Sequence, residues 1–168
     1  MYINKMDSFL IRKIKPEDDP KIEEIILATF PEFDMPLVGT AFEDEEIRQM
    51  FASYQNHNEV YYIVEEKEDV VGGAGIKPLK GFENDVCEFQ KMYLSPYARG
   101  KGYGKLLFTR CLKEAKKLGY KRCYLESASQ FKRAIKIYEK SGFNHLEGPM
   151  GNTGHYSCGV WMIKDLWN

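Results

Sequence analysis

The chain has 168 residues, of which 43% are hydrophobic and 14% aromatic, as expected for one globular domain with a substantial core. Its 24 lysine and arginine residues nearly balance 25 aspartate and glutamate residues, so the formal charge of -1 gives no general attraction for nucleic acid or anionic membranes. Because no apolar run approaches the roughly 20 residues of a membrane span, and no signal peptide is evident, we expect a cytoplasmic protein without a membrane partner.

The first third of the chain predicts one strand followed by two helices. Residues 1–6 precede these elements and are expected to form a flexible tail of a single domain spanning residues 1–168. Residues 8–14 predict a strand, and an amphipathic helix with acidic residues in its first turn then ends before Pro31. After a loop, residues 43–56 predict a second, acidic helix.

Three strands are predicted next, at residues 60–64, 70–76 and 86–94, joined by short charged turns as an antiparallel meander. A glycine-rich turn follows, and apolar residues at helical spacing then predict a strong helix that ends at Gly119. The remaining pattern predicts a strand at 122–126, a helix carrying Phe131, Ala134, Ile135 and Tyr138, and strands at 143–146 and 156–163.

The turn Arg-Gly-Lys-Gly-Tyr-Gly at residues 99–104 lies between a strand and a helix N-terminus, where main-chain N–H groups and the helix dipole favour phosphate. Its glycines permit close approach, and Arg99 and Lys101 can add charged hydrogen bonds. The dinucleotide fingerprint would require glycine at position 105, and the P-loop pattern would require glycine at position 99. The turn fits neither motif, and a purely structural tight turn is the alternative.

Two segments resemble motifs of the GNAT superfamily of N-acetyltransferases. Residues 92–107, MYLSPYARGKGYGKLL, resemble its cofactor motif, and residues 134–143, AIKIYEKSGF, resemble its later helix-to-strand motif. The resemblance implies an α/β (α+β) fold with a mixed, mostly antiparallel sheet of about seven strands and helices on both faces. It also implies direct transfer of an acetyl group from acetyl-CoA to a primary amine in a ternary complex, without a metal.

The resemblance further implies which residues bind acetyl-CoA. Phe131 departs from the family pattern, because many relatives carry asparagine there, and Gln130 or Ser129 could supply the missing polar contact. The expected cofactor-binding residues are Met92, Tyr93, Leu94, Arg99, Gly100, Lys101, Gly102, Tyr103, Gly104, Lys105, Phe131, Ala134 and Tyr138.

Glu88 is the candidate general base. Deprotonating an amine of pKa about 10.4 at pH 7 costs about 4.6 kcal/mol, so a nearby carboxylate would help. Period-two alternation places Glu88, Gln90, Met92 and Leu94 on one face of their strand. The position of Glu88 resembles that of the general-base glutamate in the histone-acetylating branch of the family. A surface carboxylate, or one paired with a lysine, is the alternative.

Tyr138 matches the tyrosine that lies beside the thioester sulfur in many relatives and acts there as a general acid. A hydrogen bond to the departing sulfur is a more conservative role than full proton transfer, because phenol is a weaker acid than thiol. Since Tyr138 shares a stripe with apolar residues, a core aromatic is the alternative.

The acceptor is expected to be a small-molecule amine, amino acid or peptide, recognised by Phe30, Phe33, Glu88 and His155. His155 and Cys158 could suggest an acyl-cysteine route, but in a strand these positions face opposite sides. The four cysteines form no Cys-x-x-Cys pair, so free thiols and no metal site are expected. We expect the protein to be a monomer or a homodimer. Two functions other than catalysis are the alternatives: a non-catalytic acyl-CoA-binding or sensing module, and a nucleotide-phosphate binder.

Overall fold

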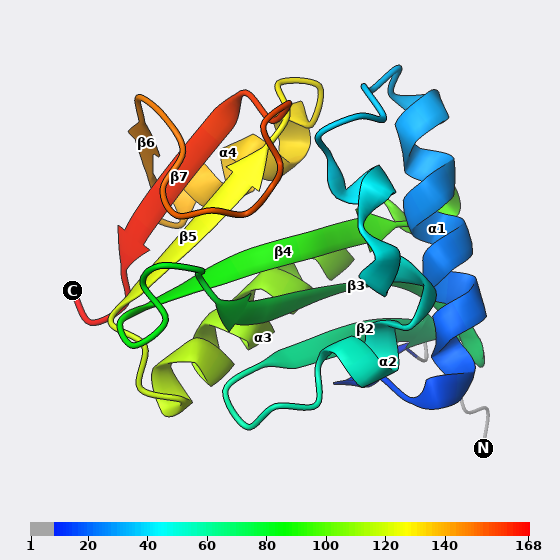
Figure 1. Ribbon diagram of the computed structural model, residues 1–168. Coiled ribbons are helices and arrows are strands. Elements are labelled where there is room, and N and C mark those ends of the chain that lie inside the picture. The colour runs from blue at the N-terminus through cyan, green and yellow to red at the C-terminus, as the bar shows by residue number, and fades with distance from the viewer. Residues whose placement is uncertain (1–8) are drawn as a thin grey trace.

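The computed structural model describes residues 9–168, and the tail expected at residues 1–6 lies outside that range. Within it, seven strands form one sheet in the order β1-β2-β3-β4-β5-β7-β6, and every neighbouring pair is antiparallel except β4 with β5 (Figure 1). This architecture confirms the expected fold class. The strands are β1 (Phe9–Lys13), β2 (Val60–Glu66), β3 (Asp69–Pro78), β4 (Val86–Leu94), β5 (Arg122–Ser127), β6 (Asn144–Leu146) and β7 (Val160–Asp165).

Helices cover both faces of this sheet (Figure 1). On one face lie α1 (Asp19–Glu32) and α2 (Met50–Ser53), and on the other lie α3 (Tyr103–Lys117) and α4 (Lys132–Lys140). Four single-turn 3-10 helices complete the described elements: η1 (Pro16–Asp18), η2 (Ala41–Glu43), η3 (Glu45–Arg48) and η4 (Pro96–Ala98). No helix in residues 9–168 is both long and apolar enough to cross a membrane.

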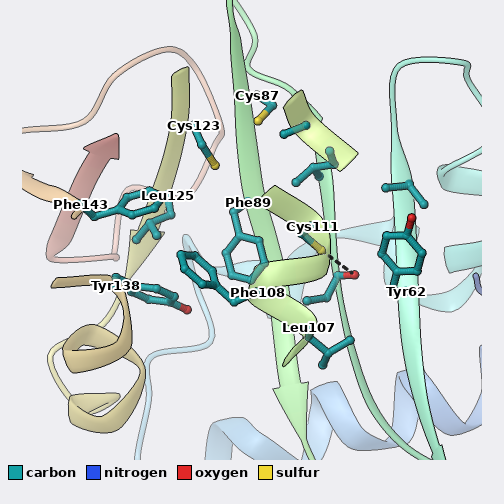
Figure 2. Packing of buried hydrophobic residues seen from close by; sticks show 14 of the residues in the cluster. Tyr62, Cys87, Phe89, Leu107, Phe108, Cys111, Cys123, Leu125, Tyr138 and Phe143 are labelled. Atoms are coloured by element: carbon teal, nitrogen blue, oxygen red, sulfur yellow. Dashed lines mark hydrogen bonds between the residues drawn. The ribbon is translucent and has the colours of Figure 1, made fainter. Parts of the chain in front are cut away.

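The core on the α3 and α4 face is rich in aromatic rings, as Figure 2 shows. Phe108 of α3 meets Phe89 of β4 edge-on at 5.2 Å between ring centroids, and it lies 5.3 Å from Tyr138 of α4. Buried aromatic contacts of this kind add about 0.5–1.5 kcal/mol beyond the area they bury. These contacts fix α3 and α4 against β4.

Helix α1 continues two residues further than the sequence pattern predicts, so the expected end before Pro31 is wrong. A proline in the last turn removes only one main-chain hydrogen bond, and the N–H of Phe33 still reaches the Thr29 carbonyl at 3.1 Å. The longer helix brings Phe33 to the region described below as the cofactor cleft.

The acidic helix expected at residues 43–56 is also wrong, because η3 and α2 take its place as two short segments. Asp44 has extended backbone, and Gln49 has φ of -143°, so neither continues a helix. The side chains of Asp44 and Glu46 pair with a buried lysine, Lys91, and these ion pairs outweigh the local helical pattern.

Candidate active site

Strands β4 and β5, the parallel pair, separate toward their carboxyl ends (Figure 1). They pair only over residues 86–89 of β4 and 122–125 of β5. Beyond that point the β4 main chain has no ladder partner on the β5 side, so its polar groups there are open to a ligand. The separation creates the space in which the candidate site lies.

Strand β4 contains a β-bulge directly after the point of separation. The register with β3 shifts there, and Lys91 has φ of +54°. Because the bulge inserts one residue, Met92 and Leu94 pack on the α3 face, whereas Glu88 and Gln90 lie on the α1 face. The expectation that alternation places Glu88 and Met92 on one face is therefore wrong.

A cleft of about 570 Å³, here called the cofactor cleft, lies between the N-terminus of α3 and helix α4. Gly100 and Gly102 have φ of +77° and +87°, a conformation that glycine adopts without strain. The N-terminus of α3 adds a favourable site for an anion. Among the described residues that line the cleft, none is acidic and six are basic: Arg99, Lys105, Lys132, Arg133, Lys136 and Lys140.

Most residues expected to bind the cofactor line this cleft, namely Met92, Tyr93, Leu94, Arg99, Gly100, Gly102, Tyr103, Gly104, Lys105, Phe131 and Ala134. The side chain of Lys101 does not, because its Nζ lies 2.7 Å from a Glu66 carboxylate oxygen, and Tyr138 lines the acceptor cavity instead. The hydroxyl of Tyr103 also donates to Glu66, at 2.6 Å. The sequence analysis did not predict four basic residues of the cleft, although they are closely spaced on one predicted helix: Lys132, Arg133, Lys136 and Lys140.

Arg99 is held at the edge of the cleft by contacts within the protein. Its Nε donates to the Leu94 carbonyl at 3.1 Å, and its guanidinium forms an ion pair with Glu32. The guanidinium also lies over the Phe33 ring, 4.9 Å from its centroid. A phosphate at this position would compete with the Glu32 carboxylate for the same donors.

Phe131 immediately precedes α4 and packs edge-on against Phe33, with 5.1 Å between ring centroids. This aromatic contact connects the end of α1 with the start of α4 across the cleft. Of the two residues considered as polar substitutes, Gln130 lines the cleft and Ser129 does not. Phe33, expected to contact the acceptor, lines the cofactor cleft instead.

A second cavity, the acceptor cavity, occupies about 110 Å³ between β4 and β5. Phe30, Glu88 and His155, all expected to recognise the acceptor, line it. It shares four lining residues with the cofactor cleft, namely Met92, Tyr93, Phe131 and Ala134. Molecules bound in the two spaces would therefore meet at this common wall.

The Glu88 side chain lies in the acceptor cavity and is only 7% exposed. Burial, together with the nearby charge of Glu126, raises the pKa of Glu88 to about 7. Lys91, His155 and a 3.0 Å hydrogen bond from Gln90 oppose this shift. A carboxyl group that titrates near neutrality has the proton affinity expected of a general base at neutral pH.

The cations beside Glu88 already have carboxylate partners. Lys91 Nζ lies 3.0 Å from Asp44 and also pairs with Glu46, and His155 Nε2 lies 2.8 Å from Asp44. Burial favours the neutral forms of Lys91 and His155, but the acidic partners outweigh it, so the pKa of each group is raised. None of these ion pairs was predicted, because their members are far apart in the sequence.

Glu126 of β5 faces Glu88 and was not predicted as a site residue. Glu88, Glu126 and His155 each offer one atom, and these three atoms lie within 4.8 Å of one another. One Glu126 oxygen accepts a hydrogen bond from Thr153, and the other is buried with no hydrogen bond of normal length and angle among the described residues. Tyr124 and Trp161 lie near enough to oppose the rise in the pKa of Glu126 that burial causes. Such a trio could also hold a metal ion. The absence of a metal ion from this site therefore stays a prediction.

Tyr138 lines the acceptor cavity and is 5% exposed. Its ring belongs to the aromatic core shown in Figure 2, where it packs against Phe89, Phe108 and Phe143. Within residues 9–168 its hydroxyl forms no hydrogen bond with another side chain or main-chain group. Burial raises the pKa of Tyr138, so the hydroxyl keeps its proton at neutral pH. The core and functional interpretations are therefore compatible.

His155 and Cys158 lie in a turn before β7, so the strand expected from residue 156 is wrong. The contact of His155 with Asp44 holds this segment, and His155 and Cys158 both line the acceptor cavity. Burial, with the charges of Glu126 and Glu88, raises the pKa of Cys158 to about 12. Because the thiol stays protonated, it is a poor nucleophile for an acyl-cysteine route.

Comparison with known proteins identifies relatives across most of the chain. The acetyltransferase (GNAT) family model matches residues 20–143. The uncharacterized N-acetyltransferase YjgM of Escherichia coli strain K12 is 38% identical over 158 residues, which cover 94% of this chain and 95% of that protein.

Solved structures show the same fold. A GNAT-family acetyltransferase from Staphylococcus aureus Mu50 has a TM-score of 0.83 and 18% identity, with 95% of this chain and 99% of that chain covered. YncA from Salmonella typhimurium, solved with acetyl-CoA, has a TM-score of 0.75 and 22% identity, with 95% of this chain and 94% of that chain covered.

Proposed function

The chain belongs to the GNAT family of acetyltransferases, and on this premise we propose that it transfers the acetyl group of acetyl-CoA directly to a primary amine in a ternary complex. The cofactor cleft fits such a donor. Its six basic residues and the α3 N-terminus suit the phosphate groups of coenzyme A, and its apolar wall suits the pantetheine arm. When bound, acetyl-CoA supplies the acetyl group as a reactive thioester.

Glu88 is the proposed base. Its carboxylate accepts one proton from the ammonium form of the acceptor, so that the nitrogen gains the lone pair needed to form the new N–C bond as the C–S bond breaks. Tyr138 is proposed to donate a hydrogen bond to the departing sulfur, which takes up the second proton lost by the nitrogen. The products are an N-acetyl amide, the coenzyme A thiol and the proton that Glu88 releases to solvent.

One observation carries the proposal: a buried carboxyl group with a pKa near neutrality lines a cavity that shares a wall with the cationic cofactor cleft. A base must lie close to the nitrogen it deprotonates, and that nitrogen must lie close to the acyl donor. The common wall of Met92, Tyr93, Phe131 and Ala134 supports the proposal, because an amine beside Glu88 would reach a donor in the cofactor cleft there.

Mass spectrometry of reactions containing isotope-labelled acetyl-CoA and a panel of primary amines tests the proposal. We expect one labelled acetyl group on nitrogen for each coenzyme A thiol released. The Glu88→Gln protein should bind coenzyme A normally but transfer about a hundredfold more slowly. Coenzyme A binding without transfer to any amine in the panel would instead favour an acyl-CoA-binding or sensing module.

A further inference from the structure

We propose that the acceptor is a primary amine with no carboxylate on the carbon that bears the nitrogen, and that Glu126 selects it by its charge. This inference rests on the proposed function and narrows the acceptor class. It favours small alkyl and arylalkyl amines over α-amino acids. Three features of the acceptor cavity support it.

The first feature is the pair of carboxyl groups that face each other across the cavity. Glu88 and Glu126, with His155, bring ligand atoms within 4.8 Å of one another. One oxygen of Glu126 is buried and accepts no hydrogen bond of normal length and angle among residues 9–168, although Tyr124 and Trp161 lie near enough to oppose the rise in the pKa of Glu126. An ammonium group placed there would give that oxygen a donor while Glu88 takes its proton.

The second feature is the lack of a spare positive charge. Among the described residues that line the cavity, only Lys91 and His155 carry cationic or titratable basic side chains. Lys91 is paired with Asp44 and Glu46, and the Nε2 of His155 is held by Asp44. The carboxylate of an α-amino acid would have to displace one of these buried partners to gain a cation, which is costly.

The third feature is the short distance between an ammonium group bound at this pair of carboxyl groups and its own α-carboxylate. An α-carboxylate is two bonds from its amine nitrogen and cannot lie more than about 4 Å from it. With the ammonium group held beside Glu88 and Glu126, that carboxylate would therefore stay close to both side chains. Repulsion between like charges at this separation disfavours the amino acid, so the same pocket that attracts an ammonium group excludes its carboxylated counterpart.

Matched pairs of acceptors that differ only in the carboxylate provide the test: ethylamine with alanine, isobutylamine with valine, and phenethylamine with phenylalanine. Reactions contain acetyl-CoA and a chelator, since Glu88, Glu126 and His155 could also bind a metal ion. We expect kcat/KM to favour the amine by at least about tenfold in each pair that reacts. The α-amino group of an amino acid has the lower pKa and the larger neutral fraction, so protonation alone would give the opposite preference.

The Glu126→Gln variant tests the role of the charge. It should lower kcat/KM for the amine about tenfold and reduce the amine-to-amino-acid ratio toward one, whereas a merely structural role would slow both acceptors equally. Glu83→Gln, at an exposed residue between β3 and β4 that lines neither space, is the matched control and should leave the ratio unchanged.

The outcomes separate this inference from the proposed function. Amino acids that react as well as their amines would overturn the inference and leave N-acetyl transfer intact. A preference for amines that Glu126→Gln does not alter would overturn the role of Glu126. Transfer to none of the six acceptors, with coenzyme A bound, would contradict both the inference and the function on which it rests.

Discussion

Arg99 illustrates how one side chain at the cofactor cleft is engaged before any ligand arrives. Its guanidinium is shared between the Glu32 carboxylate and the Phe33 ring, while Nε is fixed to the Leu94 carbonyl. Because the Nε contact and the ring also hold Arg99, we expect it to stay in place without Glu32. On this expectation the acidic partner acts mainly as a competitor for phosphate.

Replacing Glu32 with glutamine should consequently tighten coenzyme A binding by about two- to fivefold, since an exposed ion pair contributes up to about 1 kcal/mol. Isothermal titration calorimetry at low salt measures the change. Glu24→Gln, at an exposed position on the same helix, is the control and should leave the affinity unchanged. Equal or weaker binding by the Glu32 variant would show that this carboxylate positions Arg99.

Tyr138 belongs to the aromatic core and also lines the acceptor cavity. Tyr138→Phe keeps the ring contacts, so the thermal midpoint should stay within a few degrees of the wild type while kcat falls by about tenfold or more. Steady-state kinetics and thermal denaturation of the same preparations test both expectations. An unchanged kcat would mean that the Tyr138 hydroxyl has no role in the reaction and that the residue serves only in the core.

At single residues, local sequence could indicate Glu88 and Tyr138, but it could not identify Glu126 or the partners of Lys91. The prediction for Glu88 rested in part on alternation along β4, and the bulge at Lys91 makes that reasoning incorrect. The position of Glu88 in the cavity depends on the separation of β4 from β5, a long-range property of the sheet. Ion pairs between residues such as Lys91 and Asp44 likewise require the folded chain.

Among the elements, β3 is distinctive because it contains three glycines and lies between β2 and the bulged strand β4. A Cβ at Gly73 would lie 2.5 Å from Tyr61 Cε1 and 2.7 Å from the Tyr62 carbonyl oxygen. Tyr61 in turn donates a 2.8 Å hydrogen bond to the carbonyl of Lys91, so it cannot move freely. The glycine is thus needed for close packing of the ring beneath the bulge.

Gly73→Ala should therefore lower the free energy of unfolding by about 2 kcal/mol or more, because the core must shift to admit the methyl group. Urea denaturation followed by tryptophan fluorescence measures this loss. Gly159→Ala is the matched control, since no atom lies within 4 Å of the Cβ it would add. Equal stability of the two variants would mean that the sheet relaxes without strain.

The strands and the long helices were largely predictable from local patterns. Helix α3 has apolar residues on one stripe and glycine at both ends, so local preference and packing agree. The predictions for segments 43–56 and 156–159 were wrong because polar side chains in them have distant partners. Asp44 and Glu46 pair with Lys91, and the Ser157 hydroxyl donates to the Val38 carbonyl. Both failures border the acceptor cavity, where long-range electrostatics override local propensity.

For the whole molecule, burial of Glu88 lowers the free energy of unfolding by an amount that depends on pH. Its pKa rises from 4.5 to about 7 in the folded state, so between these values the folded protein retains a proton that the unfolded chain releases. Unfolding is therefore favoured as pH increases through this window. At pH 4.5 and below this contribution disappears.

Glu88→Gln removes the titration while the neighbouring Glu126, Lys91 and His155 remain. Relative to the wild type, the variant should gain up to about 3 kcal/mol in unfolding free energy between pH 4.5 and 7, since each pKa unit corresponds to about 1.4 kcal/mol. Urea denaturation of both proteins across this range checks the prediction. A difference in stability that does not change with pH would mean that Glu88 titrates normally.

The proposed mechanism depends on the whole arrangement, because in it a donor in the cofactor cleft and an amine in the acceptor cavity meet beside Glu88. The most direct test is the pH dependence of kcat/KM for acetyl transfer by the wild type and by Glu88→Gln, with the same amine. The wild type should show an inflection near pH 7 that the variant lacks, together with activity about a hundredfold higher above it. Profiles of the same shape and height for the two proteins would contradict Glu88 as the base.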